Sequence, residues 1–165
     1  MQKDDQGQAL VIERIFAAPR EKVWNAWTDP EMIKKWWGPK NFTVPHAEID
    51  FKVGGKYLFA MRGAAGPGQP IRDFWSGGTY REIVPMEKIV MTDSFTDEKG
   101  NIVPASHYGM TGEWSTELKV KIVLEDQDGG TKMTLKHVGI PAGENRDGAR
   151  EGWGQSFDKL AEILK

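Results

Sequence analysis

The sequence of 165 residues contains no cysteine, which excludes disulfide bonds, thiolate metal sites and cysteine nucleophiles. It also contains no run of about 18 apolar residues, the length that a membrane-spanning helix needs. No charge of one sign dominates, because 22 lysines and arginines face 24 aspartates and glutamates, giving a net charge of −2. Proteins that bind nucleic acids carry a surplus of basic residues, so we expect no nucleic-acid partner.

The N-terminal residues 1–8 are polar and lack the apolar stretch of a secretory signal. We therefore expect a flexible tail followed by a single domain, residues 9–165, in the cytoplasm. A chain of this size buries about two-thirds of its unfolded surface on folding, so it can form a core without disulfides. Seven tryptophans and 19 glycines stand out in the composition, a combination that suits a protein closing around a molecule.

Alternating apolar and polar residues predict a series of antiparallel strands. The predicted strands cover residues 10–16, 47–53, 56–62, 71–84, 88–95, 114–124 and 131–137. Gly77 and Gly78 indicate a bulge or bend in the long strand 71–84. Residues 96–110 are polar and rich in turn residues, which predicts a long loop.

Helical patterns occur after the first strand and at the C-terminus. Pro19 suits the first turn of a short helix that ends near Thr28, and Asp29 can cap a second short helix with Pro30 at its first position. One apolar stripe predicts a long helix over residues 146–165. Strands in a row with segregated helices predict an α+β fold. In it, a curved antiparallel sheet wraps around the long C-terminal helix, and two short helices follow the first strand.

Short motifs along the chain resemble those of a known family. They are Ala18-Pro19, Val23-Trp24, Ala26 to Glu31, Trp36 to Pro39, Ile49-Asp50, Val53 to Gly55, Tyr80 to Ile83, Gly152-Trp153 and Phe157 to Leu160. Together they resemble the heat-shock protein 90 ATPase activator C-terminal-domain-like family of the START-like (SRPBCC) helix-grip superfamily. The resemblance implies a helix-grip fold. The superfamily holds lipid carriers, hormone receptors, aromatase/cyclases and proteins that sequester toxic metabolites, so a shared fold does not select one function.

Trp153 and Phe157 lie on the apolar stripe of the last helix, which a helix-grip fold turns toward the sheet. We expect this stripe and the inward side chains of the sheet to line a cavity for a ligand. The candidate ligand-binding residues are Trp75, His107, Trp114, Leu118, Met133, Leu135, His137, Trp153, Phe157 and Leu160. A dry hydrophobic core explains the same stripe equally well, and the alternation around Trp75 allows either face of its strand to point inward.

The three histidines, His46, His107 and His137, show no metal-ligand spacing, and neither a metal nor a cofactor is expected. His137 alternates with Met133 and Leu135, so its side chain should point inward, where it could orient a ligand or act as a general base. A hydrogen-bonded core histidine is the favoured alternative. His107 lies in the long loop and could reach a pocket mouth. His137 and His107 are thus catalytic candidates, but no catalytic residue is assigned.

Two further features carry expectations about exposure. Asp93 alternates with Met91 and Phe95, which would bury its carboxylate, but we expect the neighbouring bulge to turn it outward. Trp36 and Trp37 are adjacent at the end of a predicted helix, so both cannot face the core and one should be partly exposed.

These patterns favour a protein that binds a small hydrophobic or aromatic molecule between its C-terminal helix and its sheet, for sequestration, transport or sensing. One alternative is a co-chaperone-like interaction module that resembles the heat-shock protein 90 ATPase activator and has a chaperone as its partner. A second alternative is a cyclase- or hydratase-type enzyme, and the sequence leaves open whether the chain is an enzyme. The expected state is a monomer or a homodimer.

Overall fold

The helices and strands occur in the predicted order. The computed structural model describes residues 9–165, and the predicted tail, residues 1–8, lies outside this range. The strands are β1 (Ala9–Phe16), β2 (Thr43–Ile49), β3 (Lys56–Ala64), β4 (Ile71–Val84), β5 (Lys88–Thr96), β6 (Leu118–Gln127) and β7 (Gly130–Val138). The helices are α2 (Arg20–Thr28), α3 (Pro30–Trp36), the 3-10 helix η1 (Ala105–Tyr108) and α4 (Glu144–Ile163). Over residues 9–165, no helix is long and apolar enough to cross a membrane.

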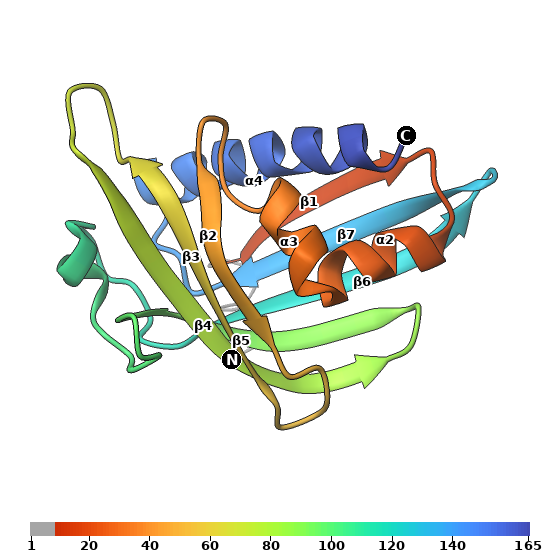
Figure 1. Cartoon of the computed structure of the whole chain (residues 1–165), viewed down its shortest axis with the longest axis horizontal. Coiled ribbons are helices and arrows are strands. Elements are labelled where there is room, and N and C mark those ends of the chain that lie inside the picture. Colours follow the sequence, from red (N-terminus) through yellow and green to blue (C-terminus); the bar gives the residue numbers. More distant parts are fainter. Residues whose placement is uncertain (1–8) are drawn as a thin grey trace.

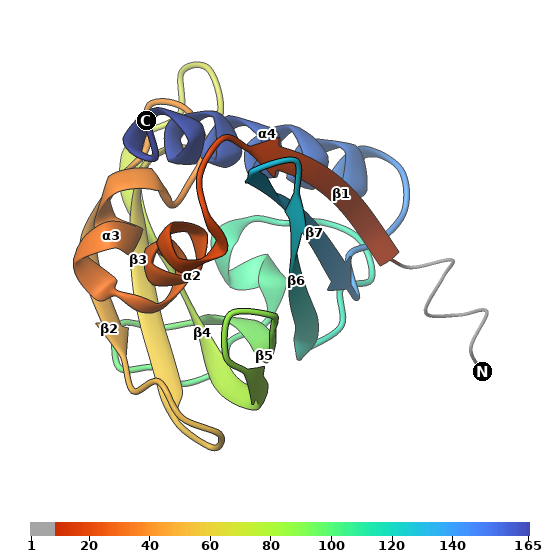
Figure 2. The ribbon, with the colours of Figure 1, turned by 90° about the vertical axis from the view of Figure 1, so that its right-hand side faces the viewer.

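The strands form one antiparallel sheet in the order β1-β7-β6-β5-β4-β3-β2. The sheet curves, and α4 lies along β1 on its concave side (Figure 1). Figure 2 shows α2 and α3 on the same side, where α2 contacts β6 and β7 and α3 contacts β2 and α4. This arrangement confirms the α+β helix-grip fold. The functional question therefore concerns the space that α4, α2 and α3 enclose with the sheet.

The two short helices follow directly from their sequence. The Asp29 carboxylate accepts a hydrogen bond from the Glu31 backbone N–H at 2.9 Å, which caps α3, and Pro30 occupies the first helical position. Asp29 is thus the only residue between α2 and α3. This sharp junction brings Trp27 and Trp36 together, with ring centroids 4.8 Å apart.

Strands β2 and β6 differ most from their predicted bounds. The strand predicted over 47–53 ends at Ile49, and Val53 is 63% exposed because the chain turns there toward β3. The strand predicted from Trp114 begins at Leu118 instead. Trp114 lies in the preceding loop, where its indole N–H donates to the Thr111 carbonyl at 2.9 Å. In both places the alternation of apolar and polar residues in the sequence extends beyond the residues that pair in the sheet, so it does not mark the end of the strand.

The bulge also lies elsewhere. The pairing between β4 and β5 shifts between Tyr80 and Glu82, and not at Gly77 and Gly78. Gly78 has a different reason to be glycine, because a Cβ atom there would lie 2.0 Å from the Thr92 carbonyl oxygen. The pairing of β4 with β5 therefore keeps one register from Trp75 to Tyr80, where the bulge was expected.

Trp36 and Trp37 are both buried, at 0% and 8% exposure, so the prediction that one is exposed is wrong. The reason is local. Trp37 is not helical but caps the C-terminus of α3 with extended backbone angles, φ −66° and ψ 139°. The helical argument about adjacent residues does not apply to it, and its ring turns back toward Phe59 of β3, with centroids 4.9 Å apart.

Candidate ligand-binding site

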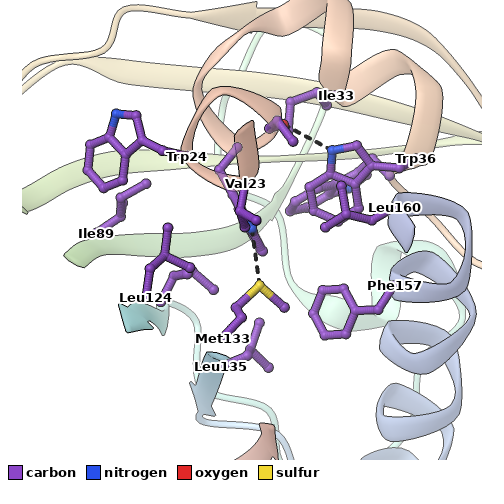
Figure 3. Packing of buried hydrophobic residues seen from close by; sticks show 14 of the residues in the cluster. Val23, Trp24, Ile33, Trp36, Ile89, Leu124, Met133, Leu135, Phe157 and Leu160 are labelled. Atoms are coloured by element: carbon purple, nitrogen blue, oxygen red, sulfur yellow. Dashed lines mark hydrogen bonds between the residues drawn. The ribbon is translucent and has the colours of Figure 1, made fainter. Parts of the chain in front are cut away.

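Helix α4 places its apolar stripe against the sheet as predicted. Phe157 and Leu160 project from α4 toward Met133 and Leu135 of β7 (Figure 3), and all four side chains are fully buried. Most of the predicted ligand-binding residues meet in this space: Leu118, Met133, Leu135, His137, Trp153, Phe157 and Leu160. The space divides into two regions of different chemistry.

Aromatic rings fill the region next to α2 and α3. We call this group the aromatic core; it consists of Trp27, Trp36, Trp37, Phe59 and Phe157. Its contacting rings have centroids 4.8–6.4 Å apart, most of them edge-on or tilted. The Trp36 indole N–H donates to the Ala26 carbonyl at 2.9 Å, a bond drawn in Figure 3. None of these side chains is more than 8% exposed, so this region is a dry core.

Four polar side chains lie beyond the aromatic core. We call them the polar chain: Tyr57 of β3, Asp93 of β5, His137 of β7 and Trp153 of α4. The Trp153 indole N–H donates to His137 Nδ1 at 3.1 Å, and His137 Nε2 lies 3.2 Å from Asp93 Oδ2. The Tyr57 hydroxyl lies 3.3 Å from Asp93 Oδ1 and donates to the Thr92 carbonyl at 2.7 Å. Four separate elements thus bring one connected group of polar atoms into an apolar interior.

The bond from Trp153 determines which nitrogen of His137 carries the proton. An indole N–H only donates, so Nδ1 accepts and the ring proton of the neutral imidazole sits on Nε2. Nε2 is buried and has no hydrogen-bond partner among the described residues, although Asp93 Oδ2 lies 3.2 Å away. The carboxylate is close but off the line of the N–H bond. A buried donor without an acceptor costs about 1–3 kcal/mol, so it requires an explanation.

Burial raises the pKa of the Tyr57 phenol well above its ordinary value, and the Asp93 carboxylate raises it further. Burial also raises the pKa of Tyr80, whose ring lies 5.6 Å from that of Tyr57. Both phenols therefore remain protonated near neutral pH. Within the polar chain, Tyr57 is a permanent donor and Asp93 an acceptor.

A second set of rings continues from the polar chain toward the surface. We call it the aromatic arc: Phe42, Phe74, Phe95, Tyr108 and Trp114. Neighbouring rings have centroids 5.4–6.1 Å apart. Phe42, Phe95 and Trp114 are only half-buried, in contrast to the aromatic core. The Arg72 guanidinium lies over Phe74 and Tyr108, 5.2 and 5.1 Å from their centroids.

Two predicted site residues lie elsewhere. Trp75 pairs with Ala60 on the outer face of the sheet, and its ring is 5.3 Å from His46. Its neighbour Phe74 faces inward, and this removes Trp75 from the predicted cavity. His107 is exposed on η1, with its ring 4.8 Å from Tyr108.

The sequence prediction omitted Tyr57 and Phe95 and turned Asp93 outward, which is wrong. Asp93 faces inward because β5 keeps its alternation, so that Ile89, Met91 and Asp93 share one face. The alternation of residues along β5 in the sequence already indicated this inward direction of Asp93. Tyr57 likewise alternates with the buried Phe59, and the same count would have placed it inside.

The opposite face of the sheet carries a groove of about 350 Å³. It lies over β3, β4 and β5, and its floor includes the hydroxyls of Thr92, Ser94 and Thr96. No group of three or more His, Cys, Asp or Glu side chains within residues 9–165 is arranged to hold a metal ion.

Known proteins resemble this chain in family and fold. A family model described as "Activator of Hsp90 ATPase homolog 1-like protein" matches residues 17–165. A crystal structure of a protein from Chromobacterium violaceum is 28% identical, with a TM-score of 0.75 over 96% of this chain and 97% of that one. A protein from Nitrosomonas europaea is 24% identical, with a TM-score of 0.75 over 97% and 96%. The AHSA1 protein of Silicibacter pomeroyi is 23% identical, with a TM-score of 0.72 over 94% and 96%. No curated protein matches.

Proposed function

This chain belongs to the family of Activator of Hsp90 ATPase homolog 1-like proteins, within the START-like (SRPBCC) helix-grip superfamily, and from that premise we propose that it binds a small hydrophobic or aromatic molecule. The fold is one of ligand-binding and co-chaperone-like modules in general. The ligand lies between α4 and the sheet, beside the polar chain, and binding serves sequestration, transport or sensing.

The observation that carries this proposal is the polar chain itself. Ligand sites combine apolar and aromatic walls with a few convergent polar groups. Asp93, His137 and Tyr57 converge in a largely apolar interior. The half-buried Phe95 follows Asp93 by two residues on the same face of β5, and its ring contacts that of Trp114. A core that served stability alone has no need of these polar groups.

The aromatic core sets the inner limit of the site. Its rings are buried and in contact with one another, so a ligand there would have to displace side chains. The region between the polar chain and the aromatic arc requires less rearrangement, because Asp93 keeps 20% of its side-chain surface exposed. We therefore place the ligand on the arc side of Trp153.

The test is native mass spectrometry of the full chain with a panel of neutral aromatic and aliphatic compounds, followed by calorimetric titration of those that bind. Trp153→Ala should weaken binding at least tenfold or abolish it. Trp75→Ala is the matched control, because that tryptophan lies on the outer face of the sheet. The proposal fails if no compound binds, or if both variants weaken binding equally.

A co-chaperone-like role is the second candidate, and the description of the matching family favours it. In that case the chain contacts an Hsp90-type ATPase through its surface and needs no interior ligand. Added to such a chaperone from the same cell, it should stimulate ATP hydrolysis, and Trp153→Ala should leave the stimulation unchanged as long as the fold is intact. Absence of both complex and stimulation removes this candidate.

A further inference from the structure

We propose that the ligand carries a hydroxyl group on an aromatic body, and that this hydroxyl accepts a hydrogen bond from His137 Nε2–H and donates one to the Asp93 carboxylate. This deepens the proposed function and rests on it, since it names the chemical class that the site selects. Three observations carry it: a buried donor without a hydrogen-bond partner among the described residues, a carboxylate beside it, and the Trp153 ring in contact with the donor's imidazole.

The donor is the Nε2–H group of His137. Trp153 occupies Nδ1, so Nε2 holds the ring proton, and the described residues offer it no hydrogen-bond acceptor in line. The side chain is 9% exposed, so bulk water does not easily replace a partner. Buried donors are rarely left unpaired in folded proteins. A ligand atom that accepts from Nε2 removes this defect.

The acceptor is the carboxylate of Asp93. Its Oδ2 atom lies 3.2 Å from His137 Nε2, and its Oδ1 atom is 3.3 Å from the Tyr57 hydroxyl, a long contact. Carboxylate oxygens offer about four lone-pair sites, so Asp93 can accept a further bond. Its side chain is 20% exposed, so it is not closed off from solvent.

The two groups together select the ligand chemistry. A hydroxyl accepts a hydrogen bond at its oxygen and donates its own proton, so a single ligand group can serve both the Nε2–H donor of His137 and the neighbouring Asp93 carboxylate. An ammonium group only donates and leaves Nε2–H unpaired. A ketone or ether only accepts and gives nothing to Asp93, and a ligand carboxylate is repelled by it. A hydroxyl serves both groups.

The surrounding rings select the body that carries the hydroxyl. The Trp153 ring lies edge-on to the His137 ring at 5.9 Å, and Phe95 and Trp114 lie edge-on to each other at 5.4 Å. Flat faces of this kind favour a flat aromatic partner, in offset or edge-to-face contact. A phenol unites both requirements.

The experiment compares probes that differ in one group. 4-Propylphenol, 4-propylfluorobenzene, 4-propylbenzylamine and 4-propylbenzamide are titrated into the full chain by calorimetry, because fluorine replaces the hydroxyl with little change in size. 4-Propylphenol should bind about tenfold tighter than 4-propylfluorobenzene, since one to two hydrogen bonds to buried groups are at stake. Asp93→Leu and His137→Leu should each remove most of that difference. Ser94→Ala, next to Asp93 but on the outer face of β5, should leave it unchanged.

Each outcome of this comparison supports or overturns the hydroxyl proposal. Equal binding of 4-propylphenol and 4-propylfluorobenzene overturns the hydroxyl proposal while the proposed function stands. Tighter binding of the amine or the benzamide overturns it in favour of that group. If none of the four probes binds the unaltered chain, the hydroxyl proposal falls, and the broader compound panel then decides the proposed function. The comparison of the probes on the unaltered chain stands even if a leucine variant does not fold.

Discussion

The aromatic core and the polar chain occupy neighbouring parts of the same space under α4, yet they are built differently. In the aromatic core the indole N–H groups of Trp27 and Trp36 have acceptors, and no side chain exceeds 8% exposure. In the polar chain, His137 Nε2 has no hydrogen-bond acceptor within residues 9–165, and the Asp93 side chain is 20% exposed. The aromatic core therefore offers little to a ligand, whereas the polar chain still has a donor and an acceptor that can form hydrogen bonds.

Trp153 lies at the border of the two regions. Its ring stacks on Phe157 at 5.4 Å and meets Trp37 edge-on at 5.3 Å, while its N–H reaches His137. The same helix thus contributes to the aromatic core from one turn and to the polar chain from the previous one. Substitutions in the two regions should separate these contributions.

Phe157→Ala should have the largest effect, because it tests the aromatic core alone. The ring is 0% exposed and contacts Phe16, Trp27 and Trp36. Truncating a buried phenylalanine costs about 3–5 kcal/mol through lost burial and the cavity left behind. The free energy of unfolding is measured by urea denaturation. A loss below about 1 kcal/mol would mean that the aromatic core is loosely packed and open to a ligand.

Trp153→Phe should have the next largest effect and tests the polar chain. It keeps an aromatic ring but removes the N–H donor, so both nitrogens of His137 are left without a partner, at a cost of about 1–3 kcal/mol. Removing the imidazole as well should reverse part of the loss, because an apolar pair leaves no unpaired polar group. The double variant Trp153→Phe/His137→Leu should therefore lose less than the sum of the single losses. If the losses of the two single variants add up to that of the double variant, the hydrogen bond between Trp153 and His137 is weak.

High pH should destabilise the protein through its three buried phenols, Tyr57, Tyr80 and Tyr108. The pKa of Tyr57 and that of Tyr80 are raised by burial, so the unfolded chain loses these protons first. Stability is fully present below about pH 10 and falls above it, by about 1.4 kcal/mol per pH unit for each tyrosine. Tyr57→Phe should lower this slope by about one-third, because burial also raises the pKa of Tyr108, as measured by urea denaturation between about pH 9 and 11. An unchanged slope would contradict the role of Tyr57 burial.

Much of this architecture could be predicted from the sequence, because it depends on local periodicity and capping. The order of elements, the Asp29 cap and the inward direction of His137 follow from residue spacing. The polar chain could not be predicted, because its four residues come from four elements far apart in the sequence, and only strand pairing and the packing of α4 on the sheet bring them together. Asp93 was misplaced because the position of a bulge depends on the partner strand.

Lys159→Met should have the smallest effect on stability. It tests whether the aromatic core and the segment that bears Phe42 of the aromatic arc open independently of each other. Lys159 Nζ donates to the carbonyls of Trp37, Pro39 and Phe42 at 3.5, 3.2 and 3.4 Å, which ties the segment between α3 and β2 to α4. Burial lowers the pKa of Lys159, so folding removes hydration from its ammonium group and offsets part of what these bonds contribute.

Methionine at position 159 keeps the aliphatic stem, and the carbonyls that lose their donor lie near solvent, so the free energy of unfolding should change by less than about 1 kcal/mol. The segment itself should open more often. Amide hydrogen exchange at Phe42, whose N–H donates to the Pro39 carbonyl, should speed up, while exchange at Met133 in β7 stays unchanged. Lys34→Met, on the exposed side of α3, is the control and should change neither. Faster exchange at both Phe42 and Met133 would show that the aromatic core and the segment bearing Phe42 of the aromatic arc open as one unit.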